Sequence, residues 1–172
     1  MIFVTVGGEL PFDRLVRAMD GFAAAHPGED FLAQIGAGGF EPAHMRWQRT
    51  LERDAYAAAL DASEVVVAHA GMGSVLSAGE RGKPIVLLPR RARLGEHRND
   101  HQRDTVAHLA GRPGIFVAED EAALPERIAA ARAAGAHALA PTAPAGFLER
   151  LRAFVVEGRR QPGAAGGGPV IR

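Results

Sequence analysis

Short runs of apolar, often β-branched residues alternate along this chain with segments whose apolar residues recur at helical spacing. The runs typical of buried strands lie at 2–6, 31–35, 64–68, 84–88 and 114–117, with a further short strand expected at 45–51. The helical segments lie at 11–22, 53–61, 71–81, 99–110 and 121–134. This alternation predicts an α/β fold, Rossmann-like, with a mainly parallel sheet and helices on both faces.

The C-terminal part of the chain contains one further predicted element. An apolar stripe at helical spacing predicts a helix that packs on the core, and its members are Phe147, Leu148, Leu151, Phe154 and Val155. Residues 158–172 include three consecutive glycines and have no packing face, so we expect a disordered tail. The 172 residues fit one domain, which we place at 1–157.

Charge and cysteine content narrow the class of protein. Lys+Arg 20 balance Asp+Glu 20, so the chain lacks the basic excess that holds most nucleic-acid binders on phosphate. The absence of cysteine excludes disulfides and cysteine-ligated zinc. No apolar run approaches the roughly 20 residues of a spanning helix. We therefore expect a soluble, cytoplasmic protein that does not bind nucleic acid.

Two glycine turns follow predicted strands and precede predicted helices. The first contains Gly7 and Gly8, and the second contains Gly71, Gly73 and Ser74. Such turns lie at the carboxyl edge of a parallel sheet, where backbone amides and a helix N-terminus can bind phosphate without a lysine. An ordinary tight turn, with the serine only capping the helix, is an equally open interpretation. The second turn matches a dinucleotide-binding fingerprint less well, because leucine stands where that fingerprint has its third glycine.

The densest polar cluster of the chain follows the fourth long apolar run. It spans 90–102 and ends with Asn99, His101 and Gln102, whose amide and imidazole groups suit a hydroxyl-rich ligand. The alternative is a solvated loop that leads into a charged helix. His97 and His101 are four residues apart, but no third metal ligand is evident, so we expect no metal site.

Three ring-bearing residues need separate interpretation. His69 directly precedes the second glycine turn, so a contact with phosphate or sugar is as plausible as a buried core histidine. Trp47 and Tyr56 are interpreted as packing residues.

Several ordered motifs together resemble the glycosyltransferase family 28 C-terminal domain, the C-terminal half of a GT-B glycosyltransferase. They occur between residue 1 and about residue 109, at 4–15, 34–36, 69–74, 82–84 and 99–102. The family includes the N-acetylglucosaminyltransferase of peptidoglycan synthesis. It also includes two-chain enzymes, in which a free-standing donor-binding subunit joins a membrane-anchored partner. The loop at 89–102 is most similar to bacterial exopolysaccharide subunits.

The resemblance implies a role for each matching residue. Gly71, Gly73 and Ser74 would hold the diphosphate of a UDP-sugar, with His69 beside them. His101 and Gln102 would contact the sugar. Two positions depart from the family's pattern: relatives often have threonine at Gly8, and many have a carboxylate at Ser77 that holds the ribose hydroxyls. Glu80, one turn further on, is the alternative ribose contact.

From this resemblance we expect the donor subunit of an inverting, metal-independent hexosyltransferase that is inactive without its partner. UDP-sugar would be a substrate, and no cofactor is implied. A membrane-anchored subunit would supply the general base and bind a lipid-linked acceptor in exopolysaccharide or lipid-linked glycan synthesis. The chain would then lie at the inner face of the membrane through this partner. The alternatives are a catalytically silent nucleotide-sugar sensor and, third, a dehydrogenase.

Overall fold

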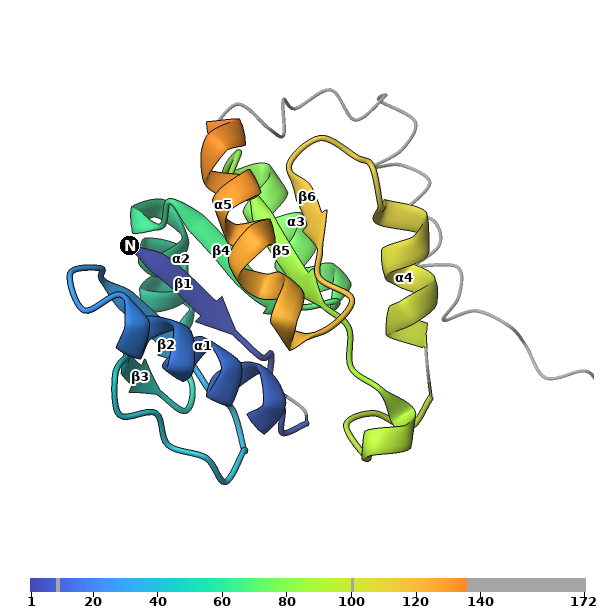
Figure 1. The fold of residues 1–172 in the computed structure, drawn as a ribbon, viewed down its shortest axis with the longest axis horizontal. Coiled ribbons are helices and arrows are strands. Elements are labelled where there is room, and N and C mark those ends of the chain that lie inside the picture. The colour runs from blue at the N-terminus through green and yellow to red at the C-terminus, as the bar shows by residue number, and fades with distance from the viewer. Residues whose placement is uncertain (9, 100, 136–172) are drawn as a thin grey trace, which may run out of the picture. The chain divides into compact units, whose positions relative to one another are not determined.

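The strands of the computed structural model form one six-stranded parallel sheet. The structure describes residues 1–8, 10–99 and 101–135, all within one compact unit. The strands are β1 (Ile2–Thr5), β2 (Phe31–Gln34), β3 (Arg46–Gln48), β4 (Val65–His69), β5 (Ile85–Leu88) and β6 (Ile115–Val117). Their order across the sheet is β3-β2-β1-β4-β5-β6, and every neighbouring pair is parallel (Figure 1). The expected α/β Rossmann-like fold is confirmed.

Helices cover both faces of this sheet, as expected. They are α1 (Asp13–Ala25), α2 (Arg53–Ala62), α3 (Met72–Glu80), α4 (His101–Leu109) and α5 (Leu124–Ala134), with short 3₁₀ turns η1 (Ala92–Leu94) and η2 (Glu121–Ala123). Helices α1 and α5 share one apolar core layer with the sheet, and α2, α3 and α4 share the other. Figure 1 shows α1 and α5 in front of the sheet, with α2 and α3 behind it.

The continuous apolar runs of the sequence follow from this two-sided burial. In β1, Ile2 and Val4 pack into the layer of α1 and α5, whereas Phe3 packs into the layer of α2 and α3. All three side chains have no exposed surface. A central parallel strand therefore has no polar face, which is why its residues do not alternate with period two.

The strand order places the ends of β1 and β4 side by side. Thr5, the last residue of β1, pairs with Ala68 of β4, and the chain leaves these two strands toward opposite sides of the sheet. At such a switch point the loops diverge and leave a crevice, where parallel α/β sheets bind ligands. Both glycine turns of the sequence begin at this point.

Two expectations lie outside the described residues: the C-terminal helix around 147–155 and the tail at 158–172. The boundary of the domain at 157 stays a prediction for the same reason. Within the described part of the chain, none of the helices combines the length and apolarity needed to cross a bilayer.

Candidate functional site

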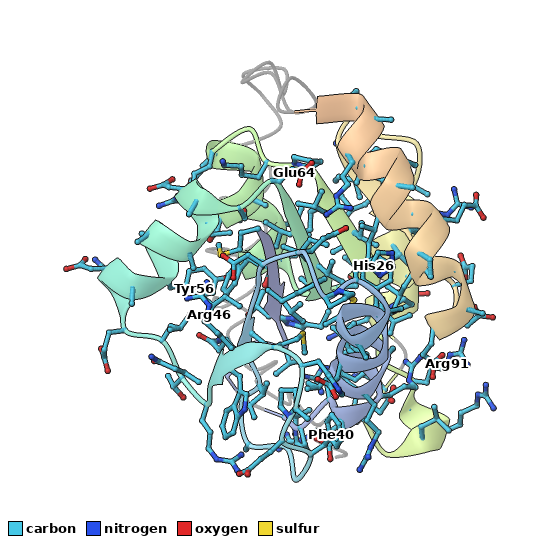
Figure 2. The ribbon with its side chains drawn as sticks, turned by 60° about the vertical axis from the view of Figure 1, so that its left-hand side comes forward. His26, Phe40, Arg46, Tyr56, Glu64 and Arg91 are labelled. Carbon is cyan, nitrogen blue, oxygen red and sulfur yellow. The ribbon has the colours of Figure 1, made fainter. Side chains whose placement is uncertain are left out.

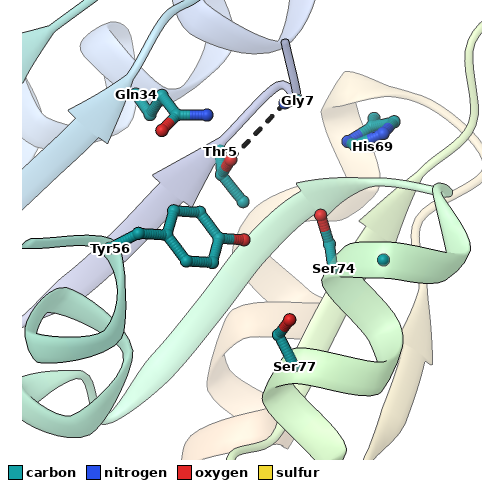
Figure 3. Close-up of a pocket in the computed structure, with 8 residues that line it drawn as sticks. Thr5, Gly7, Gln34, Tyr56, His69, Ser74 and Ser77 are labelled. Atoms are coloured by element: carbon teal, nitrogen blue, oxygen red, sulfur yellow. Dashed lines mark hydrogen bonds between the residues drawn. The ribbon is translucent and has the colours of Figure 1, made fainter. Parts of the chain in front are cut away.

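A cavity of about 350 Å³ opens at the crevice between β1 and β4 (Figure 3). Residues from three neighbouring strands and from α2 and α3 line it: Thr5, Gly7, Gln34, Tyr56, His69, Gly73, Ser74 and Ser77. Five of these residues belong to the candidate set from the sequence, and they come from both glycine turns. The fold therefore brings together two turns that lie more than 60 residues apart in the chain.

None of the other candidate residues is among the residues that line this cavity in the described part of the chain. Gly8 and Gly71 belong to the same two turns. The Gln102 side chain is buried, and its Oε1 accepts a hydrogen bond from the backbone N–H of Arg90 at 3.1 Å. Asn99 lies just before α4, and His101 is the first residue of that helix. The expected sugar contacts of His101 and Gln102 stay predictions.

The first glycine turn is shaped by backbone geometry that favours glycine. Gly7 has a φ of +74°, a region that residues with a side chain rarely adopt. Its N–H donates to the Thr5 hydroxyl at 3.4 Å (Figure 3). This turn directs the chain away from the sheet edge and leaves the end of the cavity open.

The His69 ring fills the space that glycine leaves in both turns. A Cβ at Gly7 would lie 2.8 Å from His69 Cε1, and a Cβ at Gly71 would lie 2.1 Å from His69 Nε2. Both distances are too short for real contacts, so any side chain at either position would displace the imidazole. Two glycines that the sequence associates with phosphate binding therefore also make room for the histidine.

The protein environment keeps this imidazole neutral. Burial, together with the positive charge of Arg90, lowers the pKa of His69 from 6.5 to about 4. Its Nδ1 is buried and has no hydrogen-bond partner among the described residues. At neutral pH the ring is therefore an uncharged hydrogen-bonding group that faces the cavity.

His69 should make folding stability depend on pH. The unfolded chain takes up a proton on this residue as the pH falls below 6.5, whereas the folded chain resists protonation until about pH 4. Its contribution is therefore fully present above pH 6.5 and lost as the pH falls, by about 3 kcal/mol at pH 4. Urea unfolding of the wild type and of His69→Gln between pH 7 and pH 4 measures the difference. Equal pH dependence of the two free energies of unfolding would contradict it.

The second glycine turn presents the N-terminus of α3 to the cavity. Gly71 is the N-cap of α3, so Ser74 lies inside the first turn of the helix and is not its N-cap residue. The first N–H groups of a helix have no acceptor within it, and the helix dipole makes this end positive. A Cβ at Gly73 would meet nothing within 4 Å, so open space lies directly beside these donors. This arrangement can bind an anion without a charged side chain.

Three residues that line the cavity were not candidates from the sequence. Thr5 and Gln34 end β1 and β2, and the Gln34 Oε1 accepts from the Leu51 N–H at 3.0 Å. Tyr56 does pack, as expected, with its ring edge-on to Phe3 at 5.3 Å, but it also lines the cavity. The signal available was position: a polar residue at the carboxyl end of a parallel strand lies at the ligand-binding edge.

The polar loop after β5 is anchored by a buried arginine. Arg90 is 2% exposed, and its guanidinium donates to the carbonyls of Val6, Leu10, Pro11 and Glu96 at 2.5–3.1 Å. It also lies over the Phe12 ring, 4.7 Å from the centroid. The base of the loop is therefore held against the first glycine turn, and these contacts occupy the Arg90 guanidinium.

Glu96 forms the second anchor of this loop. Its carboxylate accepts two hydrogen bonds from Arg14 of α1, at 2.6 and 2.9 Å, and one from the N–H of Arg91 at 2.8 Å. The bidentate geometry joins the loop to α1 through charge-assisted bonds. These contacts leave the 3₁₀ turn η1 projecting, with Arg93 and Leu94 exposed.

The described residues show a site without a charged lining. No carboxylate, lysine or arginine is among the residues that line the cavity. In the same part of the chain, no three His, Asp or Glu side chains converge as metal coordination requires. Tyr56, which lines the cavity, lies on the α2 side of the sheet, whereas Phe40 lies beside α1 (Figure 2).

Comparisons with known proteins place these features in context. A family model described as the glycosyltransferase family 28 C-terminal domain matches residues 1–144. The glycotransferase of kitacinnamycin shares the fold with a TM-score of 0.55 at 22% identity, over 92% of this chain and 39% of that one. The spinosyn forosaminyltransferase SpnP does so with a TM-score of 0.51 at 19% identity, over 90% and 44%. This chain thus spans about two fifths of their length. Among curated proteins, none matches the chain.

Proposed function

The chain belongs to the glycosyltransferase family 28 C-terminal domain family, and we propose that it binds a UDP-sugar in the β1–β4 cavity as the donor half of a glycosyltransferase. One observation carries the proposal: the open N-terminus of α3 and the Gly7 turn face the same cavity, which is lined by neutral hydrogen-bonding groups. Diphosphate beside Gly73 would meet the first N–H groups of α3 and the Ser74 hydroxyl, and the sugar and nucleoside would meet hydroxyl and amide groups.

The proposed chemistry is inverting and metal-independent. As the glycosidic bond breaks, the leaving UDP gains negative charge, and fixed amides at a helix N-terminus stabilise that charge most in the transition state. The same donors would hold the diphosphate in the ground state. UDP-sugar is a substrate in this scheme, and the donor site uses no further cofactor.

The proposed general base and acceptor site lie on a second chain. No carboxylate lines the described cavity, and the pKa of His69, about 4, makes this imidazole too weak a base to deprotonate an acceptor hydroxyl. We propose a membrane-anchored partner that binds a lipid-linked acceptor for exopolysaccharide or lipid-linked glycan synthesis. The chain would then act in the cytoplasm, at the inner face of the membrane.

The projecting η1 turn is the proposed docking surface for this partner. Leu94 is 48% exposed and lies next to exposed Arg93, whereas Arg90 and Glu96 hold the base of the loop against α1 and the Gly7 turn. A rigid loop that presents an apolar side chain beside a cation loses little conformational entropy on binding. This surface adjoins the donor site through the Arg90 contact with Val6.

Purified chain titrated with UDP in EDTA is expected to bind, because backbone dipoles rather than a cation neutralise the diphosphate. The same preparation should transfer no sugar from UDP-sugars to a lipid-linked acceptor, since base and acceptor site are elsewhere. Calorimetry and a radiolabelled transfer assay measure the two results.

Three other outcomes would change the proposal. Loss of UDP binding in EDTA would contradict the metal-independent site. Robust transfer by the isolated chain would contradict the two-chain arrangement. UDP binding without transfer, even when membranes containing the candidate partner are added, would favour the silent sensor instead.

A further inference from the structure

One buried guanidinium joins the polar loop after β5 to the first glycine turn. Arg90 donates to the carbonyl of Val6, before this turn, at 2.7 Å. It also donates to the carbonyls of Leu10 and Pro11, beyond the turn, at 2.7 and 2.5 Å. Its fourth acceptor is the carbonyl of Glu96, in the loop itself, at 3.1 Å. Both ends of the glycine turn and the loop are therefore held by one side chain.

The position of this guanidinium depends in turn on Glu96. The Glu96 carboxylate accepts two hydrogen bonds from Arg14 of α1, at 2.6 and 2.9 Å, and one from the N–H of Arg91 at 2.8 Å. The side chains of Glu96 and Arg14 are only 10% and 12% exposed, so solvent screens the pair little. Glu96 is not among the residues that line the described cavity. Its influence on a bound donor would therefore pass through the groups that it holds in place.

The same carboxylate closes the loop that carries the proposed docking surface. Arg91 and Glu96 flank η1, and the hydrogen bond between them draws the two ends of this turn together. Leu94 projects from the closed turn with 48% of its surface exposed. The docking surface and the first glycine turn thus share one support, which consists of Glu96 and Arg90.

We propose that Glu96 is a positioning residue that couples the η1 surface to the donor site, acting through Arg90 on the first glycine turn; this rests on the proposed function. Diphosphate that orders the glycine turn would also fix the carbonyls on both sides of it, and with them the guanidinium and the loop. Such coupling is reciprocal, so a partner that orders η1 would strengthen donor binding by the same factor. It requires no change of shape, only a loss of motion that both binding events share. The donor site would therefore reach its full affinity only when the partner that binds the acceptor is docked.

Glu96→Gln tests the role of this carboxylate in donor binding. Glutamine keeps the length and one acceptor oxygen but loses the charge-assisted pair with Arg14. Titration is expected to show that UDP binds about 3- to 10-fold more weakly than to the wild type. Glu121→Gln is the matched control, because Glu121 also pairs with Arg14, at 3.1 Å, but lies in η2 outside the loop. Its UDP affinity should stay within about twofold of the wild type. Thermal unfolding checks that both variants are folded.

Hydrogen exchange with and without UDP measures the coupling itself. The N–H groups of Arg91, Leu94 and Gly95 are hydrogen-bonded within the loop, so their exchange reports its opening. Saturating UDP should slow exchange across residues 91–96 of the wild type by at least about threefold. In Glu96→Gln saturated with UDP, this protection should disappear while protection at the start of α3 remains. A residue that only stabilised the fold would change exchange equally with and without UDP.

The outcomes separate this inference from the proposed function. A wild type that fails to bind UDP would contradict the donor site, and the coupling would fall with it. A wild type that binds UDP without protection of residues 91–96 would overturn the coupling alone, even if Glu96→Gln does not fold. Protection that persists in folded Glu96→Gln would overturn it too, because UDP would then affect the loop without the carboxylate. Equal weakening of UDP binding in Glu121→Gln would assign the effect to Arg14 and overturn the role of Glu96.

Discussion

Gly73→Val is expected to weaken UDP binding at least about 100-fold while the chain stays folded, a loss of roughly 3 kcal/mol. A Cβ at this position meets no atom within 4 Å, and the glycine does not have a positive φ, so valine fits the backbone. Its side chain would, however, occupy the space beside the first N–H groups of α3, where the diphosphate is proposed to bind. Calorimetric titration with UDP measures the loss, and circular dichroism follows the fold.

Gly21→Val is the matched control for this experiment. Gly21 is also a helical, exposed glycine at which an added Cβ would meet nothing within 4 Å, but it lies on α1, outside the cavity lining. Valine has a low helix propensity at both sites, so the comparison isolates the effect of placing the side chain beside the cavity. A folded Gly73→Val protein with the affinity of Gly21→Val would show that the diphosphate binds elsewhere. Gly71→Val is unsuitable, since it would collide with His69.

Arg90→Met is expected to lower the free energy of unfolding by about 3–5 kcal/mol. Methionine replaces part of the apolar stem, but it leaves four backbone carbonyls, at Val6, Leu10, Pro11 and Glu96, without their donor. Buried acceptors without partners cost about 1–3 kcal/mol each, reduced where water can enter. Urea unfolding measures the change. UDP affinity should fall as well, because the Val6 carbonyl directly precedes the Gly7 turn.

Arg93→Met provides the comparison on the same loop. Arg93 is exposed on η1, so its replacement should change the free energy of unfolding by less than about 0.5 kcal/mol. Arg90→Lys should be nearly as destabilising as Arg90→Met, since one ammonium cannot reproduce the planar fork of donors. Equal stability of the Arg90 and Arg93 variants would mean that the loop does not depend on the buried guanidinium.

Most of the fold could be predicted from local patterns. The apolar runs predicted every strand to within about two residues at each end, except that β3 (Arg46–Gln48) is shorter than its predicted segment. Pro125 lies in the first turn of α5, where its missing N–H costs nothing, and the α-helix begins at Leu124, three residues after the start of the predicted segment at 121. Strand and helix periodicities are properties of neighbouring residues, so the sequence alone carries them.

By itself, the sequence determined the α/β alternation and the two glycine turns, because each is encoded in residues close together along the chain, and it determined the family through the order of several such local motifs. The tertiary structure alone decided which residues share the cavity. Gln34 joins His69 there because the strand order places β2, β1 and β4 side by side, and Tyr56 joins them because α2 packs on Phe3 of β1. It also decided that Arg90 is buried, since four carbonyls converge on it from segments about 80 residues away and from its own loop. Burial and convergence depend on contacts between distant segments, which no local pattern records.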